Sequence, residues 1–181
     1  MNKCSRCEQA TNFHYGLKGE RADKTKLLML PHRADRRIEE YLEGYWGALK
    51  HSATGSTLDR MLKAAGLEFQ DIYLTNFFKC LLPKDRHPTK QEYENCLIQF
   101  QQQVEDFQPN GIVIFGNEPY MHIFPEQAKT TPITQANGEL TYNETPVLVS
   151  IHPSQIWKKR NPNLQRHYIE RVSAFLIKYK R

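Results

Sequence analysis

The four cysteines of this 181-residue chain fall into two widely separated pairs. Cys4 and Cys7 form a C-x2-C pair near the N-terminus, and Cys80 and Cys96 form a C-x15-C pair much further along. Four thiolates can hold Zn²⁺ or an iron–sulfur cluster. The pattern therefore predicts one four-thiolate metal centre that clamps the N-terminal arm onto a distant part of the fold, with structural disulfides as the alternative.

The spacing of the second pair bears on the identity of the metal. A zinc site usually closes its second pair with a short C-x2-C knuckle, and fifteen intervening residues are too many for that. Cys80 would lie in a loop after a strand and Cys96 inside a helix, an arrangement that suits a larger cluster. The spacing favours iron–sulfur, while zinc stays open.

Length and charge limit the class of protein. The chain is long enough for one compact domain, 1–181, and too short for two comfortable ones. No apolar run approaches the roughly 20 residues that span a bilayer, and Met1–Glu20 lacks the apolar segment of a signal peptide. We expect a cytoplasmic monomer in a reducing compartment. The net charge of +5 fits a polyanionic partner without requiring one.

Hydrophobic patterning predicts an α/β fold. Nearly continuous apolar runs, typical of parallel strands covered on both faces, occur at Lys26–Leu30, Ile72–Thr75, Gly111–Phe115 and Val147–Ile151. Helical patterns occur over Ser56–Ala65, from a Thr89–Glu92 capping box to about Phe107, and over Pro162–Tyr179. Asn137-Gly138 predicts a hairpin turn and a small antiparallel excursion over 132–145. Together these elements predict a sandwich around a four-stranded, mainly parallel sheet.

Ligands of such sheets bind beyond the carboxyl ends of the strands. The segments at these ends are Pro31–Asp35, Asn76–Cys80, Gly116–Tyr120 and His152–Ser154. Three of the four carry side chains that are capable of chemistry. Their convergence predicts a functional site at this edge of the sheet.

Several stretches, taken together, resemble one known family. They are Thr54–Leu67, Asp71–Pro83 with a T-N-x-x-K-C-x-x-P motif, Pro109–Gly116, and Ile151–Ser154 with an H-P-S motif. With the cysteine spacing, they resemble the iron–sulfur (family 4 type) uracil-DNA glycosylases over nearly the whole chain. The resemblance implies a single uracil-DNA-glycosylase-like domain, a three-layer α/β/α sandwich, and a [4Fe–4S] cluster held by Cys4, Cys7, Cys80 and Cys96.

The first motif departs from the family pattern. The family has G-E-A-P-G after its first strand, with a carboxylate that helps hydrolysis, whereas this chain has P-H-R-A-D at Pro31–Asp35. His32 takes the place of the acid, and the only carboxylate of this segment is Asp35, three residues further along the chain. This change bears on uracil specificity more than on the fold.

The aromatic residue that stacks on uracil in the family is also missing from its expected place, near Lys50. Tyr45 and Trp46 lie a few residues earlier and could supply an aromatic face. A lost stacking aromatic and a changed first loop could make room for a substituent on the base. The favoured substrate is therefore a modified pyrimidine, with uracil as the other candidate.

Removal of a base needs a group that stabilises the departing anion and a group that handles the sugar cation or the water. His152 is the predicted stabiliser, a donor near O2 of a leaving pyrimidine, and Asn76 would read the pairing edge of the base. Asp35 would orient the water or stabilise the cation, and His32 could act as general base. Arg33 would contact a phosphate or a base substituent. Ordinary strand-end, turn or surface roles are the alternatives.

Apolar and basic residues follow the H-P-S motif. Gln155-Ile156-Trp157 precedes Lys158-Lys159-Arg160, a composition that fits an apolar wedge filling the gap left by a flipped base, flanked by phosphate-binding cations. Ser154, Trp157, Lys158, Lys159 and Arg160 are therefore predicted to contact single- or double-stranded DNA. A buried tryptophan at a helix entry is the alternative.

The leading prediction is a monofunctional DNA glycosylase that flips out a base, hydrolyses its glycosidic bond and leaves an abasic site. No lysine shows signs of a Schiff-base nucleophile. The role would be DNA repair or defence against viruses with modified DNA. The main alternative is a non-catalytic nucleic-acid-binding module with the glycosylase fold, and a third is a zinc-stabilised α/β protein that acts on a small molecule.

Overall fold

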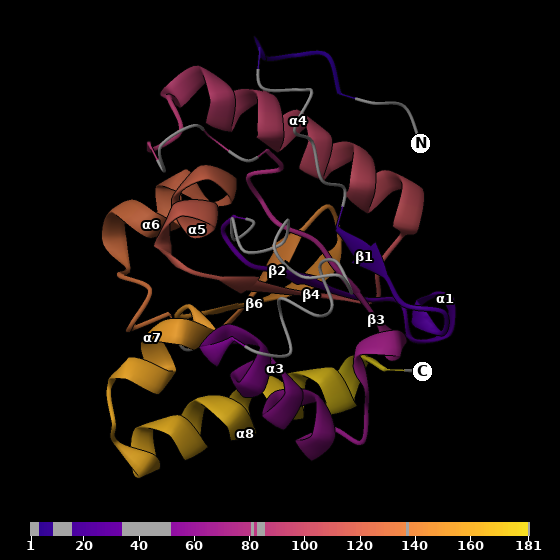
Figure 1. The fold of residues 1–181 in the computed structure, drawn as a ribbon, viewed down its shortest axis with the longest axis vertical. Coiled ribbons are helices and arrows are strands. Elements are labelled where there is room, and N and C mark those ends of the chain that lie inside the picture. The colour runs from indigo at the N-terminus through magenta and orange to yellow at the C-terminus, as the bar shows by residue number, and fades with distance from the viewer. Residues whose placement is uncertain are drawn as a thin grey trace.

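The computed structural model describes residues 4–8, 16–33, 52–80, 82, 86–136 and 138–180. Within them, six strands form one sheet in the order β1-β3-β2-β4-β6-β5, with helices on both faces (Figure 1). The strands are β1 (Leu17–Lys18), β2 (Leu27–Leu30), β3 (Ile72–Leu74), β4 (Gly111–Phe115), β5 (Glu139–Tyr142) and β6 (Thr145–Ser150). The predicted α/β sandwich is confirmed, but the sheet has six strands rather than four.

The central strands β3, β2, β4 and β6 are parallel and coincide with the four predicted runs. Leu28 lies opposite both Tyr73 and Ile112, and Ile112 lies opposite Val147. These four side chains enter the hydrophobic core on one face of the sheet, whereas their neighbours along each strand, such as Met29, enter a second core on the other face. Burial on both faces explains why the runs are continuously apolar.

The two additional strands lie at the edges of the sheet and run antiparallel to their neighbours. β1 has two residues, too few for a pattern, and β5 alternates exposed and half-buried positions. β5 joins β6 through Asn143 and Glu144, whose φ angles of 45° and 66° suit a tight hairpin turn. The antiparallel hairpin was therefore predicted in the right region, but its turn is formed by Asn143 and Glu144 rather than by the predicted Asn137-Gly138 pair. Gly138 directly precedes β5, and Asn137 lies outside the described residues.

The helices form the two outer layers of the sandwich (Figure 1). One face of the sheet carries α4 (Lys90–Phe107), α5 (Asn117–Ile123) and α6 (Pro125–Thr130), and the other carries α3 (Ala53–Ala64), α7 (Pro153–Lys158) and α8 (Pro162–Tyr179). The short helices α1 (Ala22–Thr25) and η3 (Phe69–Asp71) lie beside the β1 edge. No helix in the described part of the chain is both long and apolar enough to cross a membrane.

Local signals at the helix ends explain why α3 and α4 were predictable. Thr89 and Glu92 form the expected reciprocal capping box at the start of α4. At the end of α3, Gly66 has a φ of 66° and its N–H donates to the carbonyl oxygen of Lys63 at 3.0 Å. This left-handed residue ends the helix as glycine commonly does.

Candidate active site and cysteine cluster

The loop after β2 continues to pair with the segment after β3. The backbone N–H of Phe77 donates to the carbonyl oxygen of Pro31 at 2.8 Å, and that of Phe78 donates to the carbonyl oxygen of His32 at 2.7 Å. These bonds extend the parallel ladder beyond the sheet, so the first loop and the segment starting at Asn76 lie together. The predicted convergence at the carboxyl edge is therefore seen for these two segments.

His152 follows β6 and caps the first turn of α7. Its Nδ1 atom receives a hydrogen bond from the backbone N–H of Ser154 at 3.3 Å and lies 2.8 Å from the Ser154 hydroxyl. Because Nδ1 is an acceptor, the ring proton of the neutral imidazole is on Nε2. Burial lowers the pKa of His152 to about 4, so the ring is neutral near pH 7 and offers Nε2–H as a donor.

Gly116 lies beside His152, at the point where β4 leads into α5. Its backbone N–H donates to the carbonyl oxygen of Ser150 at 2.9 Å, which joins the ends of β4 and β6. Its φ of 99° and ψ of 158° fall in a region nearly restricted to glycine. The backbone at this corner of the site is therefore sensitive to substitution.

We expect Gly116→Ala to lower the free energy of unfolding by about 1–3 kcal/mol, because alanine tolerates this backbone conformation poorly. The added methyl group itself would find room, since the nearest atoms, Cβ and Cδ2 of His152, lie 3.7 and 3.8 Å away. Urea denaturation measures the loss. Gly138→Ala is the matched control, because Gly138 has open space around it. Equal losses in the two variants would contradict the backbone explanation.

His32 lies in the first loop and faces α4. Its Nε2 atom is 2.9 Å from the hydroxyl oxygen of Tyr93, and the two rings are stacked with centroids 5.9 Å apart. Burial lowers the pKa of His32 to about 4, and the positive charge of Arg33, with that of His152 when this ring is protonated, acts in the same direction. The predicted general base and the predicted anion stabiliser are therefore electrostatic neighbours.

A stack of aromatic rings, which the sequence did not predict, lies behind His32. Tyr93 of α4 stacks on His122 of α5 with centroids 4.2 Å apart, and Phe77 stacks on His122 at 5.8 Å. Burial lowers the pKa of His122. Tyr93 occupies a core position in the α4 pattern, so periodicity predicts only that it is buried. Its contact with a site residue depends on tertiary packing.

The structure describes only some of the other predicted site residues. Asn76 is buried at the end of β3, next to the first loop. Arg33 is half-buried, and its Nη1 atom donates to the carbonyl oxygen of Arg86 at 3.4 Å. Asp35, Tyr45 and Trp46 lie outside the described residues.

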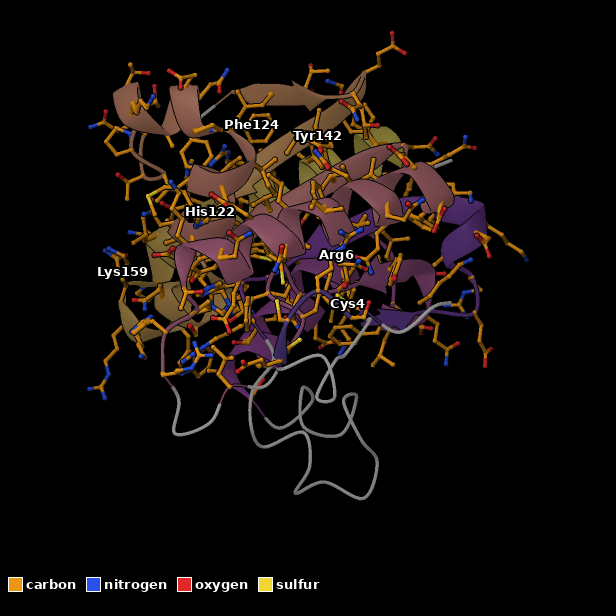
Figure 2. The ribbon with its side chains drawn as sticks, turned by 90° about the horizontal axis from the view of Figure 1, so that it is seen from above. Cys4, Arg6, His122, Phe124, Tyr142 and Lys159 are labelled. Atoms are coloured by element: carbon orange, nitrogen blue, oxygen red, sulfur yellow. The ribbon has the colours of Figure 1, made fainter. Side chains whose placement is uncertain are left out.

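The predicted DNA-binding segment forms α7 and the turn after it. Ile156 is buried and Trp157 is 46% exposed, so the alternative of a buried tryptophan is wrong. An open surface hollow of about 380 Å³ lies beside it, lined by Trp157, Lys158, Arg160 and Gln165. Lys159 is exposed at the periphery (Figure 2). Trp157 therefore presents an apolar surface among cations, as a wedge would require.

The N-terminal arm lies against α4 (Figure 2). The side-chain amide of Asn95 donates to the carbonyl oxygen of Arg6 at 2.9 Å and to the sulfur of Cys7 at 3.2 Å. Asn95 is the neighbour of Cys96 in α4, so these bonds bring the first cysteine pair to the second. The predicted approach of the arm to a distant segment is therefore seen.

The four thiols share one region of the molecule. Burial raises the pKa of Cys80 to about 12, and the charges of Cys96, Cys4 and Cys7 act in the same direction. Among the described residues, no group of three or more histidine, cysteine, aspartate or glutamate side chains has the spacing to hold one metal ion.

Lys79 is completely buried next to these thiols. Its ammonium group donates to the hydroxyl of Thr75 at 2.9 Å, to the carbonyl oxygen of Asn76 and to the side-chain oxygen of Gln103. Its backbone N–H donates to the sulfur of Cys96. Burial lowers the pKa of Lys79 to about 7, and negative charge on Cys96 and Cys80 opposes this shift. The chain therefore places a buried amine, only partly protonated near pH 7, beside both the cysteine cluster and the candidate active site.

Comparison with known proteins decides the family. The sequence profile described as the uracil DNA glycosylase superfamily matches residues 17–174. The chain belongs to the uracil-DNA glycosylase superfamily. As a member it is a DNA N-glycosylase, a hydrolase that acts on N-glycosidic bonds, which confirms the predicted enzyme class.

Individual relatives agree with this assignment. The chain is 29% identical over 172 residues to a type-4 uracil-DNA glycosylase of Archaeoglobus fulgidus, covering 92% of this chain and 81% of that protein. It is 29% identical over 129 residues to a type-4 uracil-DNA glycosylase of Thermotoga maritima, covering 68% and 66%. A type-5 uracil-DNA glycosylase of Pyrobaculum aerophilum is 27% identical over 111 residues, covering 61% and 47%. The predicted resemblance to the type-4 group is thus supported by named relatives.

Proposed function

We propose that this superfamily member extrudes a pyrimidine from DNA, hydrolyses its glycosidic bond and leaves an abasic site without cutting the strand. The observation that carries the proposal is the hydrogen bonding of His152, whose Nδ1 atom is occupied by Ser154. A neutral imidazole held in this way directs its one N–H donor away from α7. Such a fixed donor is the group needed where negative charge develops on a departing base.

The reaction requires two complementary actions. As the bond between C1′ and the base nitrogen breaks, the electron pair leaves with the base, and Nε2–H of His152 donates to an oxygen on that base. Water adds to C1′, and its proton passes to an acceptor, for which His32 and Asp35 are the candidates. Bonds and charge balance, and no covalent enzyme intermediate is needed.

The substrate proposal rests on the first loop. The loop carries His32 and Arg33 where the related glycosylases carry an acid, and Arg33 lies half-exposed beside Arg86. A cation at this position fits a polar substituent on a pyrimidine ring, with Asn76 reading the pairing edge and Tyr45 or Trp46 supplying a stacking face. We therefore favour a modified pyrimidine over uracil, and a role in defence against viruses whose DNA carries such bases.

We propose that the four cysteines hold a [4Fe–4S] cluster. A zinc site usually closes its second ligand pair with a short C-x2-C knuckle, whereas fifteen residues separate Cys80 from Cys96. A four-thiolate cluster is anionic, and buried Lys79 would supply the compensating charge. When bound, the cluster would cross-link the N-terminal arm to α4. Iron and sulfide analysis separates this proposal from zinc.

The experiment that tests the activity is a base-release screen. The protein is incubated with matched duplexes and single strands containing uracil, cytosine or cytosines modified at C5, and released bases are identified by mass spectrometry. Alkali then reveals abasic sites as strand breaks. We expect release of one pyrimidine class and strand breaks only after alkali. Salt-dependent binding with no base released from any substrate would contradict the proposal and favour a non-catalytic binding module.

We expect Trp157→Ala to slow base release from duplex DNA about tenfold, equivalent to about 1.4 kcal/mol, and to slow release from single strands by less than about twofold. The wedge would offset the cost of unstacking a base, which is small in single strands. Ile177→Ala is the control, because Ile177 is a similarly exposed apolar residue of α8. Equal slowing of both substrates by Trp157→Ala would contradict a wedge.

A further inference from the structure

The peptide group between Asn76 and Phe77 is held from both sides. Its N–H, which belongs to Phe77, donates to the carbonyl oxygen of Pro31 at 2.8 Å. Its carbonyl oxygen, which belongs to Asn76, accepts a hydrogen bond from the side-chain amine of Lys79. The first bond ties this peptide group to the first loop, and the second ties it to a buried side chain.

The amine of Lys79 takes the place of a neighbouring strand. The backbone N–H groups of Thr75 and Phe77 both donate toward β2 and the loop that follows it. The backbone groups of Asn76, which lies between them, therefore face the other way, toward the β1 side of β3. In the described part of the chain, the pairing of β1 with β3 ends at Leu74. Lys79 thus supplies at Asn76 the donor that a strand supplies within the sheet.

Gln103 of α4 holds the same amine from the other end. Its side-chain oxygen accepts from Lys79, while its side-chain nitrogen donates to the hydroxyl oxygens of Tyr73 at 2.7 Å and Thr75 at 3.3 Å. The network settles the orientation of this amide, because the opposite orientation would set its NH₂ group against a second donor, the amine. The amine therefore has a fixed place between α4 and the segment after β3.

This network is closed to solvent. Lys79 and Thr75 have no exposed surface, and Asn76 and Gln103 are 1% and 4% exposed. In such surroundings water does not replace a hydrogen bond that is lost, so a buried polar network that is fully paired restrains its members strongly. The hydrogen bond from Lys79 is therefore a firm restraint on the Asn76–Phe77 peptide group.

We propose that Lys79 is a positioning residue that holds Asn76 in register with the first loop, and that Gln103 acts through Lys79 by holding its amine. The proposal rests on the proposed function, in which Asn76 reads the pairing edge of the extruded base. A peptide group that is fixed on both sides fixes the backbone from which this side chain extends. Lys79 acts through Asn76 in this scheme and does not itself touch the substrate.

The first test is amide hydrogen exchange, measured on the protein as purified. We expect Lys79→Met to speed exchange of the Phe77 amide about tenfold, because the peptide group loses one of its two restraints, and to speed that of Gly116 less than about twofold. The Gly116 amide is the internal reference, since it donates to Ser150 at the same edge of the sheet but between a different pair of strands. Lys90→Met, at an exposed lysine of α4, should leave both amides unchanged.

Two further variants separate this role from charge compensation at the cysteines. Gln103→Met keeps the amine and all four thiols, so we expect exchange at Phe77 to quicken about threefold while the iron content stays constant. Gln102→Met, at an exposed neighbour on α4, is its control. Lys79→Met/Gln103→Met leaves no unpaired acceptor on Gln103 and should match Lys79→Met, and it serves if the single variant does not fold. Equal acceleration at Phe77 and Gly116, in whichever of these variants folds, would overturn the proposal.

The second test measures rates on the substrate found in the screen. We expect Lys79→Met to lower kcat/KM about tenfold in the wild-type background. In an Asn76→Ala background the same change should lower it less than about twofold, because no reading side chain is left to position. A tenfold loss in both backgrounds would mean that Lys79 does not act through Asn76. The exchange measurements need no turnover, so a failure of base release on every substrate would count against the proposed function and leave the test of the peptide restraint intact.

Discussion

Replacing His152 with alanine is expected to slow base release by about 10²–10³-fold, the loss typical for one fixed donor at a developing negative charge. The effect should appear in kcat rather than KM, because the donor is needed most when the departing base carries charge. Single-turnover rates on the substrate found in the screen measure it. Binding of the same DNA, measured separately, should change less than about threefold.

The control for this change is His167→Ala, because His167 is an exposed histidine of α8. It should alter the rate by less than about twofold. Ser154→Ala should fall between the two, since it removes the hydroxyl but leaves the backbone N–H donating to Nδ1. A rate unchanged by His152→Ala would remove the basis of the proposed function.

The central sheet and the long helices could be predicted because their signals are local. Continuous apolar runs mark strands whose two faces are both buried, and β2 and β4 carry such runs. The Thr89–Glu92 capping box fixes where α4 begins without help from the rest of the fold. The edge strands lack such runs, since β1 is very short and β5 alternates exposed and half-buried positions.

The polar partners of the site residues could not be predicted in the same way. Nothing in the local sequence of Tyr93 indicates that it would meet His32, because the two residues come from separate elements. Lys79 looks like a surface lysine in the sequence, and its burial depends on acceptors as distant as Gln103. The residues that follow strands show where a site lies in the fold. The side chains that contact those residues come from other elements, so their identity depends on tertiary packing.

We expect Cys96→Ser to remove most of the bound iron and to lower Tm by about 10–15 °C. Loss of a ligand should release the cluster and leave Lys79 buried without its compensating charge, and an uncompensated buried charge costs about 3–5 kcal/mol. In a chain of this length, each 1 kcal/mol shifts Tm by about 2–4 °C. Iron and acid-labile sulfide content, together with thermal denaturation, measure both effects.

Two further variants separate the cluster from the charge. Ser5→Ala is the control for the arm, because Ser5 is exposed between Cys4 and Cys7, and it should keep both iron and Tm. Lys79→Met in the Cys96→Ser background should recover part of the lost Tm, since the methionine side chain leaves no buried cation behind. If Cys96→Ser kept its iron, the four-thiolate centre would be wrong. If iron were lost while Tm stayed constant, the cluster would have no role in holding the arm, and Lys79 would have to be balanced by Thr75, Gln103 and the Asn76 carbonyl alone.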